Sequence, residues 1–537
     1  MLLAGGALGC AASSEEGAAL RVPGELYTRE DARKHLAELA RRYERLMRDH
    51  GYHEWARYAG KLDEGPAAQK QMEKLRQAEH ELFTDADEVF QRFGQGVVAP
   101  RLQRLWELGA LGLKLLGDKR AAELSDALEA VINGHQFLLD GKKIARGELI
   151  TLRRSEDPAQ RRRARQLEHE LHVKAAPVAS ELIKRRIALA QELGLRSFYD
   201  SLLELRGITT ARLMGLVTEL NSYTRRAQYR LLYDLRKSAT GALTIYDLDF
   251  AVFRHVRPPE ERFDKERAIP TVKRLYAAFG IDLENPKLDL TIRDFAFGGQ
   301  SISIHVPDDV RIVVTPAPGA RFWGTLLHEL GHAYAATRTH AEHPLYAGYE
   351  WVPGLSDPAF AEGLAEVFGR LLDEPRVLKD YVGLNDEETL RMVEARRVDT
   401  LLRVPRTLSS INFERIALEQ PAANLDQLSL DLERTTLGLV APRDAEPIWA
   451  ASPFLATYPV YGQSYLLAAM MAVQVRDALK ARFGPDWVTP DAGRHLTEGA
   501  VEDGARWTLD EKLVRTTGSP LEIAPLVRFL NAEPFRG

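Results

Sequence analysis

The sequence predicts a mainly α-helical fold, with two helical lobes around a deep central cleft and a small β-sheet beside one central helix. Apolar residues recur every three or four positions over six long stretches, which is the period of an amphipathic helix. The chain has 537 residues, of which 45% are hydrophobic, and it shows no solenoid-type repeat. No long linker follows residue 24, so residues 25–537 are expected to form one domain with two lobes. The six stretches are Thr28–Tyr52, Ala67–Phe93, Leu102–Leu116, Ala121–Leu139, Pro158–Leu193 and Thr210–Ala239.

The first 24 residues differ from the rest. Residues 1–10 form a small apolar run that ends at Cys10, the only cysteine of the chain, and residues 11–24 have the composition of a flexible tether. This pattern is typical of the end of a bacterial lipoprotein signal, with Cys10 as the lipidated residue. It predicts a lipoprotein of the bacterial cell envelope or periplasm, anchored to the membrane through Cys10. The alternative is a cytoplasmic protein, since no basic residue precedes the run.

Charge excludes one class of partner. The formal net charge is −5 with both signs mixed along the chain, which argues against a nucleic-acid-binding protein. The basic run Arg161–Arg163 has Glu168 and Glu170 nearby and is interpreted as a solvated helix face.

Residues 301–314 predict a β-hairpin. Ser301 to Val306 alternates polar and apolar residues, Pro307 begins a turn, and the apolar run from Val310 to Val314 returns. His305, close to the turn, is a candidate substrate contact. The alternative is an ordinary histidine of a surface turn.

The stretch His328-Glu329-Leu330-Gly331-His332 follows the hairpin and is the most informative of the chain. Its apolar flanks predict a buried helix. In a helix, side chains four residues apart project from the same face, so both imidazoles can bind one zinc ion. Glu329 would then lie beside the open coordination position, where it can act as a general base. The alternative is that a five-residue pattern arose by chance.

A second helix offers a third metal ligand. Asp357 is an N-cap residue followed by proline at the first helical turn, and the helix is expected to stop near Pro375. Glu362 and Glu366 lie one turn apart, and two such carboxylates repel unless a positive group lies between them. Glu362 is predicted to bind the zinc ion, and Glu366 to accept a hydrogen bond from a ligand histidine. The alternative is a solvated acidic face.

These two segments resemble the gluzincin metallopeptidases, specifically the helical group of angiotensin-converting enzyme and the thimet-type oligopeptidases. The segment from Asp357 to Glu366 is similar to the ligand helix of that group, position by position. The resemblance covers roughly residues 154–483. It implies a helical enzyme with one zinc ion held by His328, His332 and Glu362.

The segment from Tyr458 to Leu467 resembles a Tyr-x-x-Tyr segment of the same group. The resemblance implies that Tyr461 donates to the oxyanion and that Tyr458 contacts substrate, with Tyr465 as a further candidate contact. A phenol suits this role because it donates a strong hydrogen bond while neutral at pH 7. The alternative is helix packing. Val460 replaces the chloride-binding arginine of the converting enzyme, so neither chloride dependence nor strict dipeptide release is implied.

The prediction is therefore a zinc-dependent peptidase of peptidyl-dipeptidase or oligopeptidase type. A zinc-activated water, with Glu329 as general base, would hydrolyse peptide bonds of short peptides. A non-catalytic peptide-binding protein on the same scaffold is an alternative. A structural zinc site is a weaker one, because such sites favour four Cys or His ligands.

Overall fold

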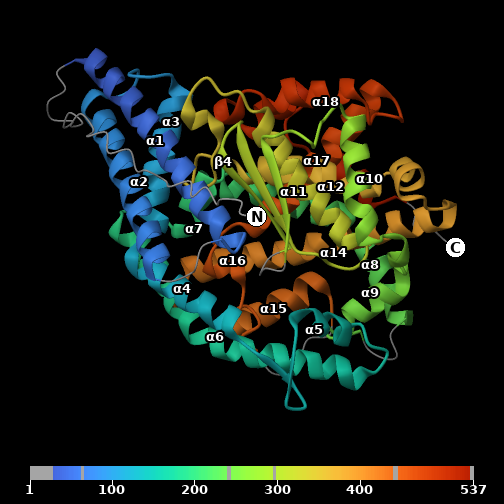
Figure 1. Cartoon of the computed structure of the whole chain (residues 1–537). Helices are drawn as coiled ribbons and strands as arrows, with labels where there is room; N and C mark the ends of the chain where they lie inside the picture. The colour runs from blue at the N-terminus through green and yellow to red at the C-terminus, as the bar shows by residue number, and fades with distance from the viewer. Residues whose placement is uncertain (1–27, 62–65, 239–242, 294–297, 440–445, 533–537) are drawn as a thin grey trace, which may run out of the picture.

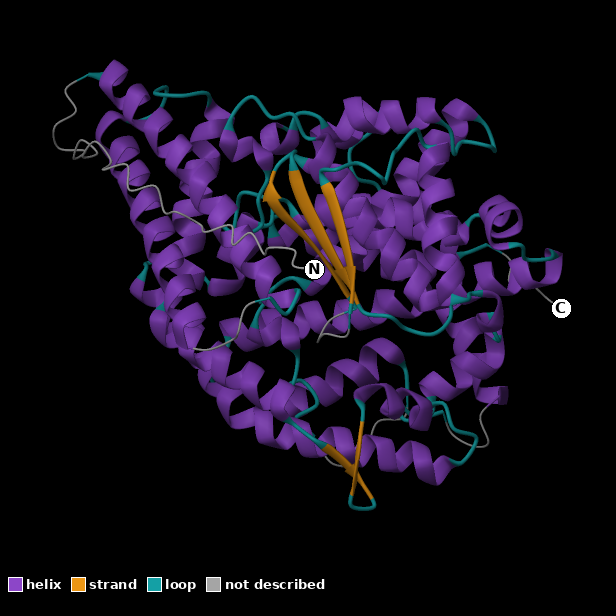
Figure 2. Ribbon diagram, viewed as in Figure 1, coloured by secondary structure: helices purple, strands orange, loops and turns teal. Residues whose placement is uncertain are grey.

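The computed structural model describes residues 28–61, 66–238, 243–293, 298–439 and 446–532. The predicted lipoprotein signal (1–10) and tether (11–24) lie outside these described residues. The fold is mainly helical, as predicted, with a small three-stranded sheet near the centre (Figure 1; Figure 2). The division into two lobes around a cleft stays a prediction.

The earlier helices of the chain lie along the left and lower sides of the molecule in Figure 1, and the three that directly precede the central sheet lie on its right side. They are α1 (Arg29–Tyr58), α2 (Pro66–Phe93), α3 (Pro100–Leu116), α4 (Lys119–Gly134), α5 (Arg146–Arg153), α6 (Pro158–Glu192), α7 (Phe198–Leu205), α8 (Thr210–Ser238), α9 (Leu248–Val256) and α10 (Lys265–Ala278).

The second half contains the helices around the candidate site and the C-terminal helices. They are α11 (Ala320–Arg338), α12 (Pro358–Gly369), α13 (Pro375–Val377), α14 (Asp386–Glu419), α15 (Leu425–Leu437), α16 (Pro453–Ala456), α17 (Gly462–Phe483), α18 (Pro490–Leu496), α19 (Leu509–Thr517) and α20 (Ala524–Leu530). None of the described helices combines the length and apolar composition needed to cross a bilayer.

One predicted helix extends too far. The stretch predicted to run to Leu139 ends as α4 at Gly134, and strand β1 (Phe137–Leu139) pairs antiparallel with β2 (Lys142–Ile144). Asp140 and Gly141 both have positive φ, at 51° and 79°. An Asp-Gly pair in this conformation forms the two-residue turn that suits a hairpin. The turn therefore overrides the helical periodicity.

The central sheet confirms the predicted hairpin and adds one strand to it. Strand β4 (Gly299–His305) pairs antiparallel with β5 (Asp309–Val314), and β3 (Leu288–Ile292) pairs in parallel with the other side of β5. The strand order is β3-β5-β4, so β4 lies at an edge of the described sheet. Ile302, Ile304 and Ile312 are buried, because helices cover the sheet.

Helices α1 and α11 lie against β4 and position it (Figure 1). At Gly51 of α1, an added Cβ would meet the carbonyl oxygen of Ser303 at 2.7 Å, so glycine permits this helix to touch the strand. Helix α11, which carries the predicted metal-binding segment, contacts both β4 and β5. The start of β4 is thereby held against Glu329.

Two glycines bring three helices into direct contact. An added Cβ at Gly331 of α11 would meet Cα of Ala365 at 2.7 Å, and one at Gly363 of α12 would meet the Met471 sulfur of α17 at 2.4 Å. Helix α12 thus lies between α11 and α17. Its packing face is buried as predicted, namely at Phe360, Leu364, Val367, Phe368 and, beyond the helix end, Leu371.

Helix α12 begins where the sequence places its start. The Asp357 carboxylate accepts hydrogen bonds from the backbone N–H groups of Ala359 and Phe360, at 3.0 and 3.1 Å. These bonds satisfy N–H groups that a helix start leaves without partners. The α-helix ends at Gly369, and a 3-10 turn (Arg370–Asp373) precedes Pro375.

Candidate metal centre

Helices α11 and α12 bring His328, His332 and Glu362 together, as the sequence predicts. The Nε2 atoms of the two histidines are 3.2 Å apart. Oε2 of Glu362 lies 3.2 Å from Nε2 of His328 and 3.9 Å from Nε2 of His332. In the described part of the chain, no other three His, Cys, Asp or Glu side chains converge in this way.

The donor set fits a zinc ion. With bonds of about 2.0–2.1 Å in tetrahedral coordination, two ligand atoms lie roughly 3.3 Å apart, close to the separations found here. Oε2 of Glu362 is buried and has no hydrogen-bond partner among the described residues. A buried carboxylate oxygen without a partner is costly, and a bound cation would remove that cost. Two imidazoles and one carboxylate are a common ligand set of catalytic zinc.

The three side chains interact strongly with one another. Burial opposes ionisation of Glu362, but the two histidines and the Tyr461 phenol lower the pKa of its carboxyl. Burial and then His328 lower the pKa of His332 to about 4, so its ring is neutral at pH 7. Burial also opposes protonation of His328, yet the Glu362 carboxylate raises its pKa to about 9. A metal ion would displace that proton on binding.

The side chain of Glu329 extends from α11 to the start of β4. Its side chain is buried, and its carboxylate accepts a hydrogen bond from the backbone N–H of Ser301. An added Cβ at Gly299 would meet Cγ of Glu329 at 2.5 Å, so only glycine leaves room for this carboxylate. Burial raises the pKa of Glu329 to about 7. A carboxyl group with such a pKa can both accept and return a proton near neutral pH.

Glu366 occupies a cationic environment one turn after Glu362. Its carboxylate lies 3.5 Å from Arg370 and 3.5 Å from Arg403. Burial alone would raise the pKa of Glu366, but Arg370, Arg403 and Arg396 together lower it to about 2. His328 and Glu366 both border Gly369, and the two side chains interact electrostatically. The predicted hydrogen bond to a histidine stays a prediction.

The three candidate tyrosines gather next to these ligands. The Tyr461 hydroxyl donates to Oε1 of Glu362 over 2.8 Å. The ring centroids of Tyr458 and Tyr465 lie 5.7 and 5.6 Å from that of Tyr461. Burial and then Glu362 raise the pKa of Tyr461 well above its usual value, so it is a neutral donor. Tyr458 is 39% exposed and can meet a ligand from solvent.

His305 lies apart from this group. It sits at the far end of β4 from Gly299, six residues away or roughly 20 Å at the rise of a strand. Its Nε2 is 3.2 Å from Oε1 of Glu44, and its Nδ1 is 3.7 Å from Asp308. These contacts match the alternative of a surface-turn histidine, and contact with substrate stays a prediction.

Four further residues of the site were not predicted from the sequence. Gly299 is the first residue of β4, and Glu350 is solvent-exposed and interacts electrostatically with Glu362 and Glu329. Arg206 and Glu414 hold the backbone beside Tyr461. Their contacts join segments distant in sequence, so no local pattern could have indicated them.

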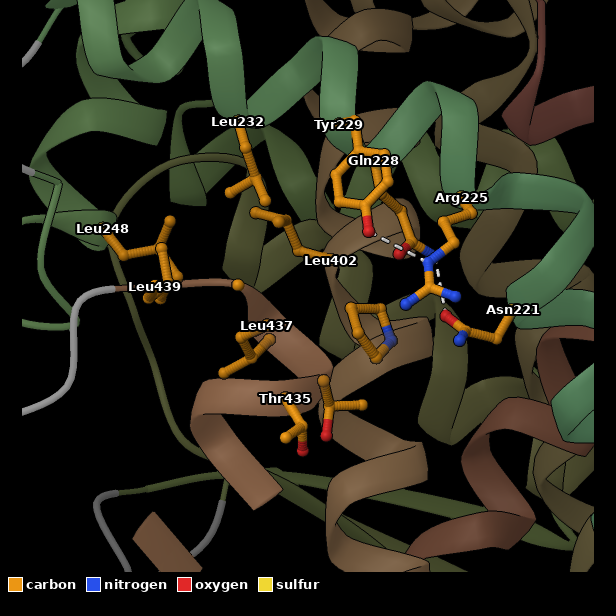
Figure 3. Close-up of a pocket in the computed structure, with 13 residues that line it drawn as sticks. Asn221, Arg225, Gln228, Tyr229, Leu232, Leu248, Leu402, Thr435, Leu437 and Leu439 are labelled. Atoms are coloured by element: carbon orange, nitrogen blue, oxygen red, sulfur yellow. Dashed lines mark hydrogen bonds between the residues drawn. The ribbon is translucent and has the colours of Figure 1, made fainter. Parts of the chain in front are cut away.

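A small pocket lies elsewhere, between α8, α14 and α15 (Figure 3). It holds about 40 Å³, and its lining includes Asn221, Arg225 and Leu402. Another cavity of about 420 Å³ lies beside the hairpin turn and includes Glu44, His340 and His343 in its lining. Neither cavity is lined by a predicted metal ligand.

Comparison with solved structures shows which fold this is. The chain is similar to a protein assigned as oligoendopeptidase F, with a TM-score of 0.71 and 16% identity over 95% of this chain and 93% of the other. It is similar to PZ peptidase A (TM-score 0.69, 16% identity, 95% and 94% covered). It is also similar to M32 carboxypeptidase from Deinococcus radiodurans R1 (TM-score 0.59, 17% identity, 93% and 97% covered).

The chain therefore has the mainly helical fold of this class of metallopeptidases, along nearly its whole length. No family model matches the sequence, and neither does the sequence of any curated protein. The narrower resemblance to the group of angiotensin-converting enzyme and thimet-type oligopeptidases stays a prediction.

Proposed function

We propose that this chain is a zinc-dependent peptidase that hydrolyses short peptides and binds one zinc ion through His328, His332 and Glu362. The observation that carries the proposal is the convergence of these three ligand atoms within 4.8 Å of one another. Support comes from the names of the solved structures with the same fold, which are peptidases.

The ligands give the ion a defined role. When bound, zinc polarises a carbonyl and lowers the pKa of a bound water toward neutrality. His328 and His332 would bind through Nε2, and Glu362 through Oε2, the carboxylate oxygen that faces both imidazoles.

Glu329 is the proposed general base and acid. Its carboxylate is buried beside the ligand helix and fixed by the Ser301 N–H, so it does not rotate freely. It would take a proton from the attacking water and pass it to the leaving amine. Tyr461 would donate its hydroxyl hydrogen to the oxyanion, and Tyr458 and Tyr465 would contact the peptide.

The sheet supports a peptide substrate. Strand β4 lies at an edge of the described sheet and begins beside Glu329. An edge strand can pair with an extended peptide through backbone hydrogen bonds. Such a substrate must be unfolded over several residues, which favours short peptides over folded proteins.

The test compares wild type with Glu329→Gln. Purified wild type should contain one zinc per chain by elemental analysis and cleave a mixed peptide library, with products identified by mass spectrometry. Glu329→Gln should keep the zinc and lose at least a hundredfold in kcat, which is the usual scale for general acid–base catalysis. Turnover retained in Glu329→Gln would refute the mechanism. Wild type that binds zinc and peptides without cleavage would be a binding protein on this scaffold.

The same experiment distinguishes the modes of cleavage. A peptidyl-dipeptidase releases dipeptides from one end of every substrate, whereas an oligopeptidase also yields internal fragments.

The lipid anchor at Cys10 is tested by mass spectrometry of this residue in protein purified from its host cell. An unmodified Cys10 would favour the cytoplasmic alternative.

A further inference from the structure

The backbone immediately before Tyr461 is strained. Val460 has a φ of +54° and is completely buried. A left-handed conformation is unusual for any residue with a side chain, and for a β-branched residue it is a clear outlier. Such a conformation persists only where its surroundings impose it. The residue that carries this strain directly precedes the proposed oxyanion donor.

Side chains from other segments form hydrogen bonds with the backbone of Val460 on both sides. Oε1 of Glu414, on α14, accepts a hydrogen bond from the Val460 N–H at 3.1 Å. The Arg206 side chain donates to the Val460 carbonyl oxygen at 2.7 Å and to that of Pro459 at 3.0 Å. Gln463 donates a further hydrogen bond to the Val460 carbonyl oxygen. These groups fix the peptide planes that enter Tyr461.

Arg206 also contacts Tyr461 itself. Its guanidinium lies 4.8 Å from the centre of the Tyr461 ring, while the hydroxyl of the same ring donates to Glu362. The phenol is therefore held at its face and at its oxygen. Val460 contacts Arg206 through its carbonyl oxygen and Glu414 of α14 through its N–H.

The local charges favour a fixed arrangement. Glu414 is buried, and burial raises the pKa of its carboxyl to about 7 against the opposing effects of the Val460 N–H, Arg186 and Arg206. Arg186 is buried and donates to the carbonyl oxygens of Leu455 and Ala456, earlier in the same loop. Side chains from α6, from the turn after α7 and from α14 thus converge on residues 455–460.

We infer that Arg206 and Glu414 are positioning residues that hold Val460 in its left-handed conformation and so aim the Tyr461 hydroxyl at the metal centre. This inference rests on the proposed function, because it assigns the purpose of the contact to catalysis. The competing explanation is that the same contacts only stabilise the fold. The two explanations predict different values of kcat when substitutions of Glu414 and Tyr461 are combined.

The test is a double-mutant cycle with Glu414→Leu and Tyr461→Phe. Tyr461→Phe should lower kcat about a hundredfold or more, as the loss of one oxyanion donor does. Glu414→Leu should lower kcat at least tenfold with KM changed less than threefold. The double variant should be no slower than Tyr461→Phe within about threefold, because the phenol through which Glu414 acts is already absent. If the kcat loss of the double variant instead equals the product of the two single losses, Glu414 does not act through Tyr461 and the inference is refuted.

Conservative and matched variants complete the design. Glu414→Gln keeps an acceptor for the Val460 N–H and should restore most of the kcat lost in Glu414→Leu. Arg397 is a buried arginine on α14, the helix that carries Glu414, and it donates to the Leu530 carbonyl oxygen. Arg397→Met is the control and should leave kcat unchanged. If Glu414→Leu does not fold, Arg206→Lys replaces it, because lysine cannot reproduce both carbonyl contacts in the same geometry.

A second readout does not need catalysis. Hydrogen exchange of peptides covering residues 455–462 should be slow in wild type and in Glu414→Gln, and at least tenfold faster in Glu414→Leu. Unchanged exchange in Glu414→Leu would overturn the inference even if the enzyme is active. Fast exchange in Glu414→Leu, together with an inactive wild type, would instead refute only the proposed function.

Discussion

Gly299 and Glu329 touch so closely that no other residue can stand at position 299 without displacing the carboxylate. An added Cβ would lie 2.5 Å from Cγ and 2.6 Å from Oε1 of Glu329. The sheet thus determines where the proposed general base can be, although the base itself belongs to a helix.

Gly299→Ala should therefore lower kcat at least tenfold while zinc content stays at one per chain. The methyl group pushes the Glu329 carboxylate away from its place beside the ligands, and small displacements of a catalytic group are costly. Steady-state kinetics and elemental analysis measure the two quantities. Gly298→Ala is the control, because its nearest neighbour would be an uncrowded 3.8 Å away, and it should behave as wild type. Equal kinetics for both variants would contradict the prediction.

Gly331→Ala should destabilise the protein by about 1–3 kcal/mol, the usual cost of overpacking a core. The added methyl would meet the backbone of α12 at 2.7 Å, which forces the two ligand-bearing helices apart and should also weaken zinc binding. Denaturant unfolding and competition with a chelator provide the measurements. Gly215→Ala, on the exposed side of α8 with no atom within 4 Å, should instead stabilise by about 0.5–1 kcal/mol. A neutral effect at Gly331 would show that the helices are not packed this closely.

Glu350 should make the site favour substrates with a positive charge. Its side chain is exposed to solvent and interacts electrostatically with the carboxylates of Glu362 and Glu329. At pH 8 it is mostly ionised and attracts Lys or Arg side chains near the scissile bond. Glu350→Gln should lower the ratio of kcat/KM between a Lys peptide and its Glu counterpart about threefold to tenfold. Glu342→Gln, exposed on the same loop and paired with Arg506, is the control and should not change this ratio.

Acid should destabilise the protein partly through His172. Burial, then Arg165 and His169, lower the pKa of His172 to about 4, whereas the unfolded chain has a value near 6.5. Between pH 6.5 and 4 the unfolded state binds the extra proton, so this part of the stability is present above pH 6.5 and is lost as the pH falls. His172→Gln should therefore show a smaller drop in Tm from pH 7 to pH 5 than wild type, both saturated with zinc. The exposed His80→Gln should follow wild type, and an identical drop in all three would contradict the assignment.

Much of the fold could be predicted because helical periodicity is a local signal. The long helices α1, α2, α3, α6 and α8 begin or end within a few residues of the expected positions. Strand β3 was not predicted, although its alternation of apolar and polar residues from Leu288 to Ile292 is a usable signal. Its parallel pairing with β5 aligns Leu288 with Val310, and periodicity carries no information about such a contact.

The convergence of the three proposed metal ligands could be predicted for a similar reason. His328 and His332 share one helix face, and Glu362 lies on a helix with a clear N-cap at Asp357. The supporting residues could not be predicted, since their roles arise from contacts between distant segments. Glu414 meets Val460 across 46 positions of sequence, and the value of that contact depends on a backbone angle that sequence does not reveal.

The contact between Arg206 and Val460 spans 254 positions of sequence, which has a consequence for biosynthesis. A ribosome completes His328, His332 and Glu362 well before it reaches Tyr461. Domains begin to fold while the chain is still emerging, so the three proposed metal ligands can meet before α17 is synthesised. On the proposed function, a partly synthesised chain could thus bind its metal ion before Tyr461 is present. The last helices would then complete the catalytic site of a chain that already holds the metal.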